Sequence, residues 1–380
     1  MTPMVRFLHT SDWQLGMTRH YFSDGAQERF SQARFEALVR LGELATEHAA
    51  EFVVVAGDVF ESNQVDRKTV SNALNALAQI PVPVLLLPGN HDPLDAGSVF
   101  RQATFTRRRP SHVHVLETSE PLALKPGVEI VGAPWTSKRP LADLVQHATR
   151  ELAPAKGVVR IVVAHGEIDA LSPNKDNPAL IELAAAESAL REGRYHYLAL
   201  GDRHSRTAVG ASGRIHYSGA PEPTDFDEVE PGFALLVELE EQRVTTQALR
   251  TGRWSFARRS VRLDGDADLD ALARELASDP ACSRSVLKLD LVGALTLAQK
   301  ARLDELLEAA RDVFAALIDE TSQRELVVVP QDSDFSQLEL SGFAASAVRR
   351  LRERAAGSDE RAGTARDALA LLLRLAERGA

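Results

Sequence analysis

The feature that most limits how this chain can fold is a series of short, β-branched apolar runs in its first 250 residues. Eight of these runs are typical of β-strands, at residues 5–8, 52–57, 82–89, 128–134, 159–166, 197–202, 214–219 and 233–240. Two amphipathic stretches separate the first three runs, with Phe35, Leu38 and Leu41 near helical spacing in one of them. Strands alternating with helices predict βαβ units in a layered α/β domain. The later runs follow one another with little helix between them, which predicts that part of the sheet is antiparallel.

The pattern changes after residue 252. Residues 258–330 read as strand, helix, strand, helix and strand, with the second helix expected over residues 297–318. From about residue 335 the chain is rich in alanine, leucine and arginine and is typical of helix. We therefore predict three parts: an α/β domain over residues 1–252, a small α+β domain over residues 253–334, and a helical tail over residues 335–380.

Composition limits the compartment and the class of protein. The 380 residues suffice for one large core and a smaller domain, and 44% apolar with 26% charged residues is ordinary for a globular protein. Cys282 is the single cysteine, which excludes an internal disulfide and a cysteine-rich zinc site. The first ten residues become polar too soon for a signal peptide, and no apolar run approaches membrane-spanning length. We expect a cytoplasmic protein with no membrane association.

The formal net charge of −10 limits the kind of partner. A protein that binds nucleic acid unaided usually has a basic excess, because neutralising phosphates supplies most of the affinity. If the substrate is a nucleic acid, bound cations or a second subunit must therefore provide much of the positive field.

Polar side chains that can bind metal follow the predicted strands, one group after each strand. In chain order these residues are Asp12 and Gln14, then Asp58, then Asn90, His91 and Asp92, then His165, and finally Asp202 and His204. Ligands of layered α/β folds bind outside the carboxyl ends of the strands, so five distant segments can meet in one crevice. Each fragment alone is a weak signal, but all five in this order make a strong one.

These motifs carry a family resemblance. D-x-Q, GD, GNHD, a histidine at a strand end and GDRH, in this order, are similar to the calcineurin-like metallophosphoesterase superfamily. The longer words "FLHTSDWQLG", "VVVAGDVFES", "YLALGDRHS" and "YSGAPEPTDFDE" resemble the SbcD type of DNA double-strand-break nuclease. The resemblance covers about the first two thirds of the chain, and the small α+β part resembles that family's capping domain. It implies a four-layer αββα sandwich.

The resemblance also implies a role for each residue. Two divalent cations would be bridged by Asp58. Their remaining ligands would be Asp12, Gln14 and His204 for one ion, and Asn90, His165 and Asp202 for the other. His91 would be the catalytic histidine that protonates the leaving oxygen or steadies the transition state, and Asp92 would orient it.

Two positions depart from the family pattern, which usually has histidine at both 14 and 202. Glutamine offers one neutral carbonyl oxygen, a poorer ligand than imidazole for transition metals, and Asp202 adds a negative charge. Three ligand carboxylates leave two divalent ions with a formal charge of about +1, against about +2 with histidine at 202. This oxygen-rich site predicts Mn²⁺ as the cofactor, with Mg²⁺ as the alternative, in preference to Zn²⁺.

The resemblance implies a metal-dependent exonuclease or endonuclease that acts on DNA in repair. Its partners would be DNA, an SbcC-like ATPase docked on the helical tail, and a second copy of the chain in a homodimer. Two alternatives remain open. The protein could hydrolyse a small phosphodiester, or it could be a catalytically weakened subunit that binds DNA ends, because the missing imidazoles could empty one metal position. The tail could equally pack on its own domain.

Five further residues could be structural or functional. Trp13 either lines the pocket or anchors its loop, and Trp254 either stacks on nucleic acid or packs at a domain junction. We expect His9 to be structural because it lies on the first strand. His112 and His114 alternate along a strand and are expected to be exposed strand residues and not ligands. The sequence does not assign the DNA-contacting residues.

Overall fold

The computed structural model describes residues 4–240, 243–320, 326–328 and 342–355, together with residues 362, 364–365 and 368–369. The chain divides into two compact units. The larger unit holds residues 1–20 and 24–255, and the smaller holds residues 21–23 and the chain from Phe256 onward. The three-part division remains a prediction, and the two units differ from it in grouping residues 21–23 with the second unit.

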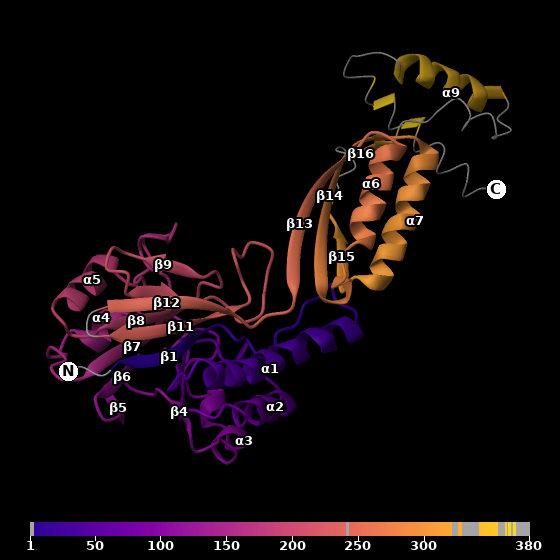
Figure 1. Ribbon diagram of the computed structural model, residues 1–380. Helices are drawn as coiled ribbons and strands as arrows, with labels where there is room; N and C mark the ends of the chain where they lie inside the picture. The colour runs from indigo at the N-terminus through magenta and orange to yellow at the C-terminus, as the bar shows by residue number, and fades with distance from the viewer. Residues whose placement is uncertain are drawn as a thin grey trace. The chain divides into compact units, whose positions relative to one another are not determined.

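The larger unit contains two six-stranded sheets (Figure 1). The first has the order β12 (Arg243–Arg250), β11 (Phe233–Glu240), β1 (Val5–Thr10), β2 (Val53–Val55), β3 (Val84–Leu86) and β4 (Val113–Val115). The second has the order β5 (Leu122–Lys125), β6 (Val128–Ala133), β7 (Val159–His165), β8 (Tyr197–Gly201), β10 (Ile215–Tyr217) and β9 (Thr207–Val209). Strands β1 to β4 are parallel, as are β6, β7, β8 and β10. Strands β5, β9, β11 and β12 pair antiparallel, which confirms the expected mixture.

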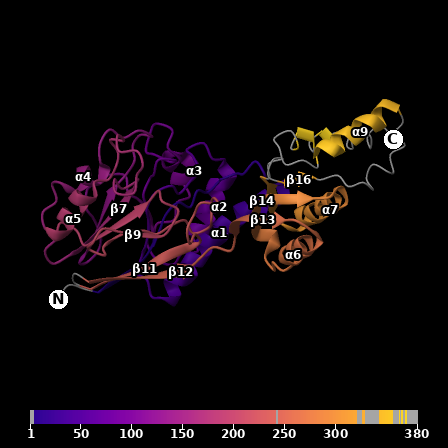
Figure 2. The same ribbon diagram turned by 90° about the horizontal axis from the view of Figure 1, so that it is seen from above.

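The two sheets pack face to face, with helices on the outer face of each. Side chains of both sheets fill the layer between them, including Phe7, Val54 and Ile161. The first sheet is covered by α1 (Asp24–Glu47), α2 (Arg67–Leu77), α3 (Ala103–Thr106) and the short 3-10 helix η1 (Val99–Arg101). The second sheet is covered by α4 (Leu144–Thr149) and α5 (Leu183–Arg191), as Figures 1 and 2 show. This is the αββα sandwich that the resemblance implied.

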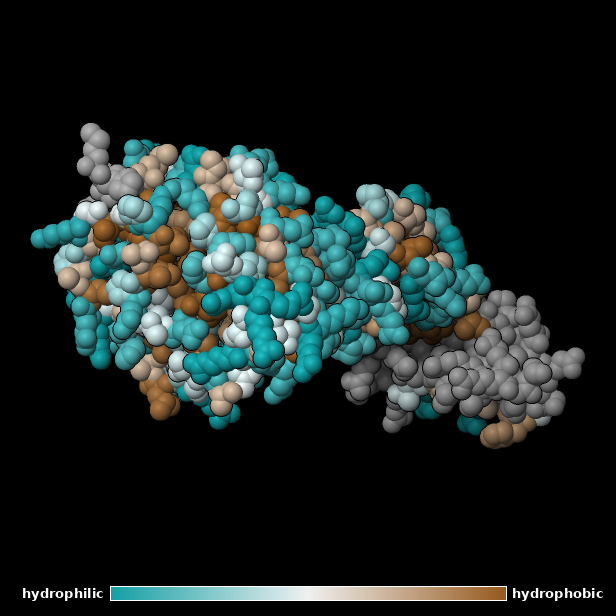
Figure 3. All heavy atoms as spheres, turned by 90° about the horizontal axis from the view of Figure 1, so that it is seen from below, coloured by the Kyte–Doolittle hydropathy of each residue, from teal (hydrophilic) through white to brown (hydrophobic). Residues whose placement is uncertain are grey.

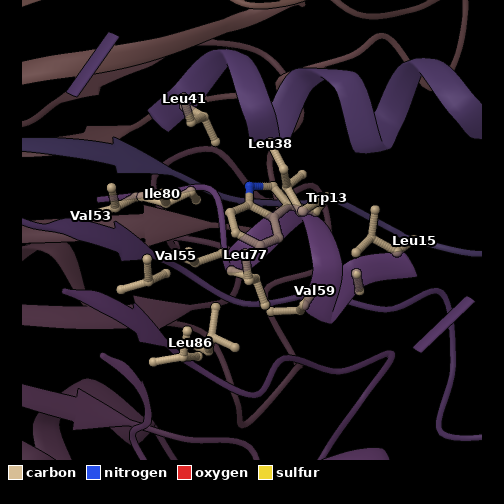
Figure 4. Close-up of a cluster of buried hydrophobic side chains, with 14 of the residues drawn as sticks. Trp13, Leu15, Leu38, Leu41, Val53, Val55, Val59, Leu77, Ile80 and Leu86 are labelled. Atoms are coloured by element: carbon tan, nitrogen blue, oxygen red, sulfur yellow. The ribbon is translucent and has the colours of Figure 1, made fainter. Parts of the chain in front are cut away.

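The helix α1 follows from the apolar spacing of its sequence. Leu38 and Leu41 are fully buried against the first sheet, as the spacing predicted. Trp13 packs beside them with 1% of its surface exposed, and its indole donates a hydrogen bond to the Thr10 hydroxyl (Figure 4). Trp13 therefore anchors the loop after β1. The next helix, α2, begins at Arg67, and the carboxylate of the preceding Asp66 caps its first turn by accepting the amide of Thr69.

The smaller unit has one sheet with helices on one side. Its strands are β13 (Ser255–Leu263), β14 (Ser285–Leu295), β15 (Ala316–Asp319) and β16 (Leu326–Val328), and both β15 and β16 pair with β14. Its helices are α6 (Asp266–Ala277), the 3-10 helix η2 (Cys282–Arg284), α7 (Leu297–Val313) and α9 (Gly342–Ala355). The helices α6 and α7 lie side by side (Figure 1) and bury their leucines against β14.

The helix expected over residues 297–318 ends earlier. It stops at Val313, and residues 316–319 form β15, which pairs in parallel with Val286–Leu289. The prediction was wrong here because a short apolar run satisfies helical and extended patterns equally, and pairing with β14 decides between them.

The remaining interpretations concern side chains and the tail. His9 is buried, with its ring nitrogens 3.1 Å from the Tyr197 hydroxyl and the Leu200 carbonyl, which agrees with a structural role. Trp254 is buried against Phe30, so it does not offer an open stacking surface. His112 and His114 are half-buried rather than exposed.

Much of the predicted tail lies outside the described residues. No helix in the described part of the chain has the length and hydropathy that a bilayer crossing requires.

Candidate metal centre

Five loops meet at one edge of the sandwich. They follow β1, β2 and β3 in the first sheet and β7 and β8 in the second, and the strands within each set are parallel. Their carboxyl ends therefore open on the same edge. Asp12, Asp58 and His165 each offer one ligand atom there, and these atoms lie within 4.8 Å of one another. All three side chains are buried.

The backbone at this edge is strained. Asp12, Gln14, Asp58 and Asp202 all have positive φ, at 53°, 44°, 51° and 96°. Residues other than glycine rarely adopt this conformation, and it persists only where surrounding contacts impose it. Close packing adds a second constraint, because a Cβ atom at Gly57 would overlap the His165 ring. The positive φ values are therefore a local cost in stability that the contacts around these residues impose.

Asp58 lies at the centre of the group. Its Oδ1 accepts a hydrogen bond from the His91 amide at 3.0 Å. Its Oδ2 lies 3.5 Å from His165 Nε2 and 3.9 Å from His91 Nε2. Burial works to raise the pKa of Asp58, but the His165 and His91 interactions more than offset it, so the pKa lies below its usual value. Asp58 is therefore ionised at neutral pH.

His165 connects the second predicted ligand group. Its Nδ1–H donates to the Ala56 carbonyl at 2.9 Å, which turns Nε2 toward Asn90 Oδ1 at 2.6 Å and Asp202 Oδ1 at 3.6 Å. Burial lowers the pKa of His165, but the nearby carboxylates, above all Asp58, raise it well above the usual range. The Nε2 proton therefore lies where several oxygen atoms converge, which is where a cation would also be favoured.

The other predicted group is Asp12, Gln14 and His204. Gln14 Nε2 lies 3.1 Å from His204 Nε2, and that ring nitrogen lies 3.8 Å from Asp12 Oδ1. The Gln14 side-chain oxygen is buried and has no hydrogen-bond partner among the described residues. Buried polar atoms are nearly always paired, so this carbonyl oxygen fits a ligand position for a cation.

Carboxylates dominate the electrostatics of the centre. Burial raises the pKa of both Asp12 and Asp202, and the charge of Asp58 adds to the effect in each case. Asp12 keeps its orientation by accepting the Asp202 amide at 3.0 Å and the Ser11 hydroxyl at 2.6 Å. Three acidic side chains crowded in a buried site are stabilised by divalent cations, so the residues present fit such ions.

Thr224 and Glu228, which were not predicted from the sequence, contact the Nδ1 side of the His204 ring. Its Nδ1 lies 2.6 Å from the Thr224 hydroxyl and 3.0 Å from Glu228 Oε1. Glu228, whose side chain is 6% exposed, also accepts hydrogen bonds from the hydroxyl and the amide of Thr224. Burial lowers the pKa of His204, but Glu228 and Asp12 raise it to about 8. A carboxylate 24 residues beyond the ligand gives no spacing signal, and "TDFDE" contributed only to the family resemblance.

His91 and Asp92 are adjacent in the chain but differ in exposure and in hydrogen-bond partners. The His91 ring has 36% of its side chain exposed, and its Nδ1 lies 2.9 Å from the Glu61 carbonyl. Asp92 was expected to orient His91, but its oxygens accept the amides of Gly89 at 2.8 Å and Phe60 at 2.9 Å. The Glu61 carbonyl, and not Asp92, therefore orients the His91 ring. Asp92 instead links the loop after β2 to the loop after β3. Burial and the charge of Asp58 raise the pKa of Asp92 to about 7.

Comparisons with known proteins agree with this geometry. The calcineurin-like phosphoesterase family model matches residues 5–237. The SbcD component of the SbcCD nuclease of Rhodobacter capsulatus is 26% identical over 279 residues, covering 61% of this chain and 66% of that protein. The same component from Escherichia coli K12 is 24% identical over 254 residues, covering 59% of this chain and 62% of that protein. The chain thus spans slightly less than two thirds of these relatives.

Solved structures include a dimetal phosphatase from Danio rerio, with 12% identity and a TM-score of 0.42, covering 65% of this chain and 96% of that structure. The family match covers more than half of this chain, and within it five strand ends bring together a carboxylate-rich centre. The chain therefore belongs to the calcineurin-like phosphoesterase family, a group of metal-dependent hydrolases of phosphate esters.

Proposed function

We propose that this protein is a metal-dependent nuclease that hydrolyses phosphodiester bonds of DNA in repair. The observation that carries the proposal is the meeting of Asp12, Asp58 and His165 within 4.8 Å at the edge of the sandwich. The similarity to the SbcD component of SbcCD nucleases supports DNA as the substrate. A repair nuclease of this kind would work in the cytoplasm.

Seven side chains would hold two divalent cations. Asp58 would bridge the ions, with Asp12, Gln14 and His204 on one side and Asn90, His165 and Asp202 on the other. When bound, such ions would supply an activated water and positive charge to hold the phosphate. His165 and His204 each have Nδ1 committed to an acceptor, which leaves Nε2 as the ligand atom.

His91 would act on the leaving oxygen of the substrate. Its Nδ1–H is committed to the Glu61 carbonyl, so Nε2 is the ring atom available to a phosphate ester. A protonated Nε2 can donate its proton to the departing oxygen, and its partial exposure lets substrate reach it. Glu61 and the amide of His91, which donates to Asp58, keep this ring beside the bridging carboxylate.

The ligand set favours hard ions. Gln14 would contribute its unpaired carbonyl oxygen, and Asp202 a carboxylate, where the family pattern usually has imidazole. We expect Mn²⁺ to support the highest activity and Mg²⁺ to follow, because oxygen ligands suit these ions better than Zn²⁺. Activity measured while each ion is titrated into chelator-treated protein tests this, and the highest rate with Zn²⁺ would contradict it. The variant carrying Gln14→His and Asp202→His should shift the preference toward Zn²⁺.

One assay tests the proposed function against its alternatives. Purified protein with Mn²⁺ is given linear DNA or bis-(p-nitrophenyl) phosphate, with Asp58→Asn and His91→Ala as controls. Cleavage of DNA that both substitutions abolish supports the proposal. Dye release without DNA cleavage would instead indicate a phosphodiesterase of small substrates, and DNA binding without turnover would indicate a catalytically weakened end-binding subunit.

Partners would supply the positive field that the chain lacks. With a net charge of −10, binding to DNA should depend on the bound cations and on an SbcC-like ATPase, and we propose a homodimer as the working form. The helix α9 carries Arg349, Arg350, Arg352 and Arg354 within the proposed docking tail. Removing residues 335–380 should leave a metal-binding enzyme that no longer co-purifies with the ATPase, whereas a chain that fails to fold would favour packing of the tail on its own unit.

A further inference from the structure

Arg34 is a buried cation outside the proposed metal-binding and catalytic residues. It lies on α1 with 2% of its surface exposed, among the largest fully buried side chains of the described chain. Burying a guanidinium is costly unless its hydrogen bonds are met by well-placed acceptors. Burial lowers the pKa of Arg34 to about 10, partly opposed by Glu222 and Glu228, so the side chain remains charged at neutral pH.

The acceptors of Arg34 belong to two distant segments of the metal centre. Its Nη1 donates to the Trp13 carbonyl at 3.0 Å, and its Nη2 donates to the Pro223 carbonyl at 3.2 Å. These segments are separated from Arg34 by 21 and 189 residues in sequence. A planar guanidinium can hold two carbonyl groups at a set separation, which an ammonium on a flexible stem does less well.

The first segment carries Asp12 and Gln14, and the second contacts His204, the third member of that ligand group. Trp13 lies between Asp12 and Gln14, both of which have positive φ and need outside contacts to keep that conformation. Pro223 directly precedes Thr224, whose hydroxyl lies 2.6 Å from the Nδ1 of His204. Gln14 and His204, whose Nε2 atoms lie 3.1 Å apart, are therefore supported by the two segments that Arg34 joins.

Aromatic packing keeps Arg34 itself in place. The guanidinium lies over the ring of Phe30, 4.5 Å from its centroid, and Phe30 packs edge-on against Trp254 at 5.0 Å. The amide of Trp254 donates to the carboxylate of Glu222, the residue that directly precedes Pro223 in the chain. Arg34 thus sits in a packed assembly that continues into the segment it binds.

We propose that Arg34 is a positioning residue that holds the loop of Asp12 and Gln14 and the segment of Pro223 and Thr224 at the separation one shared cation requires. The inference rests on the proposed metal-binding role of Gln14 and His204. Arg34 touches neither the substrate nor the ion, and acts through the backbone between them.

The test compares two buried arginines. Arg160 is 8% exposed and lies near the start of β7, at the opposite end of that strand from His165. It donates hydrogen bonds to the carbonyl groups of Ala153 and Arg194 and to the carboxylate of Glu129. Arg34→Met and Arg160→Met each remove the donor of two backbone carbonyl groups. Mn²⁺ binding to each chelator-treated full-length variant is measured by calorimetry, and thermal unfolding is recorded without metal.

We expect Arg34→Met to weaken one of the two Mn²⁺ sites by about 10- to 100-fold, the range typical of residues that orient metal ligands. Arg160→Met should lower the unfolding temperature and leave both affinities within about twofold of the wild type. Arg34→Lys keeps the charge but has a single donor nitrogen, so it should fold and give an intermediate affinity; it also serves as the test if Arg34→Met does not fold.

The outcomes separate the two proposals. Unchanged Mn²⁺ affinity in Arg34→Lys and Arg34→Met, or an equal loss in Arg160→Met, would overturn the positioning role alone. Wild-type protein that binds no Mn²⁺ would instead contradict the proposed function. If the wild-type protein binds two Mn²⁺ ions but does not cleave DNA, the proposed nuclease activity is wrong, and the positioning role of Arg34 is unaffected.

Discussion

Gln14 illustrates how a single residue can look out of place in sequence and fit its surroundings in the structure. Where the family pattern has imidazole, this chain has an amide whose oxygen is buried and unpaired within the described residues. Its nitrogen meets the ring of His204, which Glu228 fixes from the other side. The sequence predicted a ligand at position 14, but the support from Glu228 appears only in three dimensions.

Glu222 gives a prediction at the scale of one residue. It is 1% exposed, and its oxygens accept the amides of Arg253 and Trp254. Burial raises its pKa from 4.5 to about 6. Because the folded protein binds this proton more tightly than the unfolded chain does, the contribution of Glu222 to stability is fully present below pH 4.5 and declines as pH rises through 6.

Glu222→Gln removes this ionisation. We expect the unfolding free energy of the wild type minus that of the variant to fall by about 2 kcal/mol between about pH 4 and about pH 7.5. Urea unfolding at a series of pH values measures the difference. A difference that stays constant across this range would show that burial does not perturb Glu222.

At the scale of elements, short strands hold the site because the loops that follow them are tied to one another. Asp92 is the clearest case: it is fully buried and accepts the amides of Gly89 and Phe60, which follow β3 and β2. A sequence motif such as GNHD identifies these residues as functional, yet it does not say which side chain faces the ligand and which faces the backbone. That distinction depends on how neighbouring loops pack.

Asp92→Ala should destabilise the protein by about 2 to 6 kcal/mol, because two buried amides lose their acceptor at roughly 1 to 3 kcal/mol each. Asp92→Asn should cost about half as much, since one oxygen remains. Asp95→Ala is the control in the same loop: Asp95 is only half-buried, so water can replace its bonds to Gly97 and Asn63. Chemical denaturation compares the three, and equal losses for Asp92→Ala and Asp95→Ala would contradict the argument.

At the scale of the whole molecule, each unit has its own hydrophobic core, and every predicted metal ligand belongs to the larger one. Hydrophilic side chains cover most of the face in Figure 3, with hydrophobic positions between them. Under the proposed function, an acidic chain with such a surface has little general attraction for DNA, so DNA binding should concentrate at cations held in the centre.

Binding of Mn²⁺ should stabilise the larger unit specifically. At about 100 times the dissociation constant, one bound ion adds about 2.7 kcal/mol to stability. Hydrogen exchange followed by mass spectrometry should therefore show slower exchange across residues 1–20 and 24–255 with Mn²⁺, and unchanged exchange in the unit from Phe256 onward. Chelator should reverse the effect, and Asp58→Asn should show none of it. Equal protection of both units would mean that the ions act elsewhere.

The sequence by itself determined the layered α/β fold and the residues gathered at the strand ends, because apolar period, glycine turns and ligand types are local properties of the chain. It misjudged the end of α7 and the partner of Asp92, and it gave no indication of Glu228, Glu61 or Arg34. Only the tertiary structure decided these points. Apart from Gly89, which is three residues from Asp92, the hydrogen-bond partners lie far away in the chain, and a hydrogen bond between distant segments leaves no spacing for a sequence to reveal.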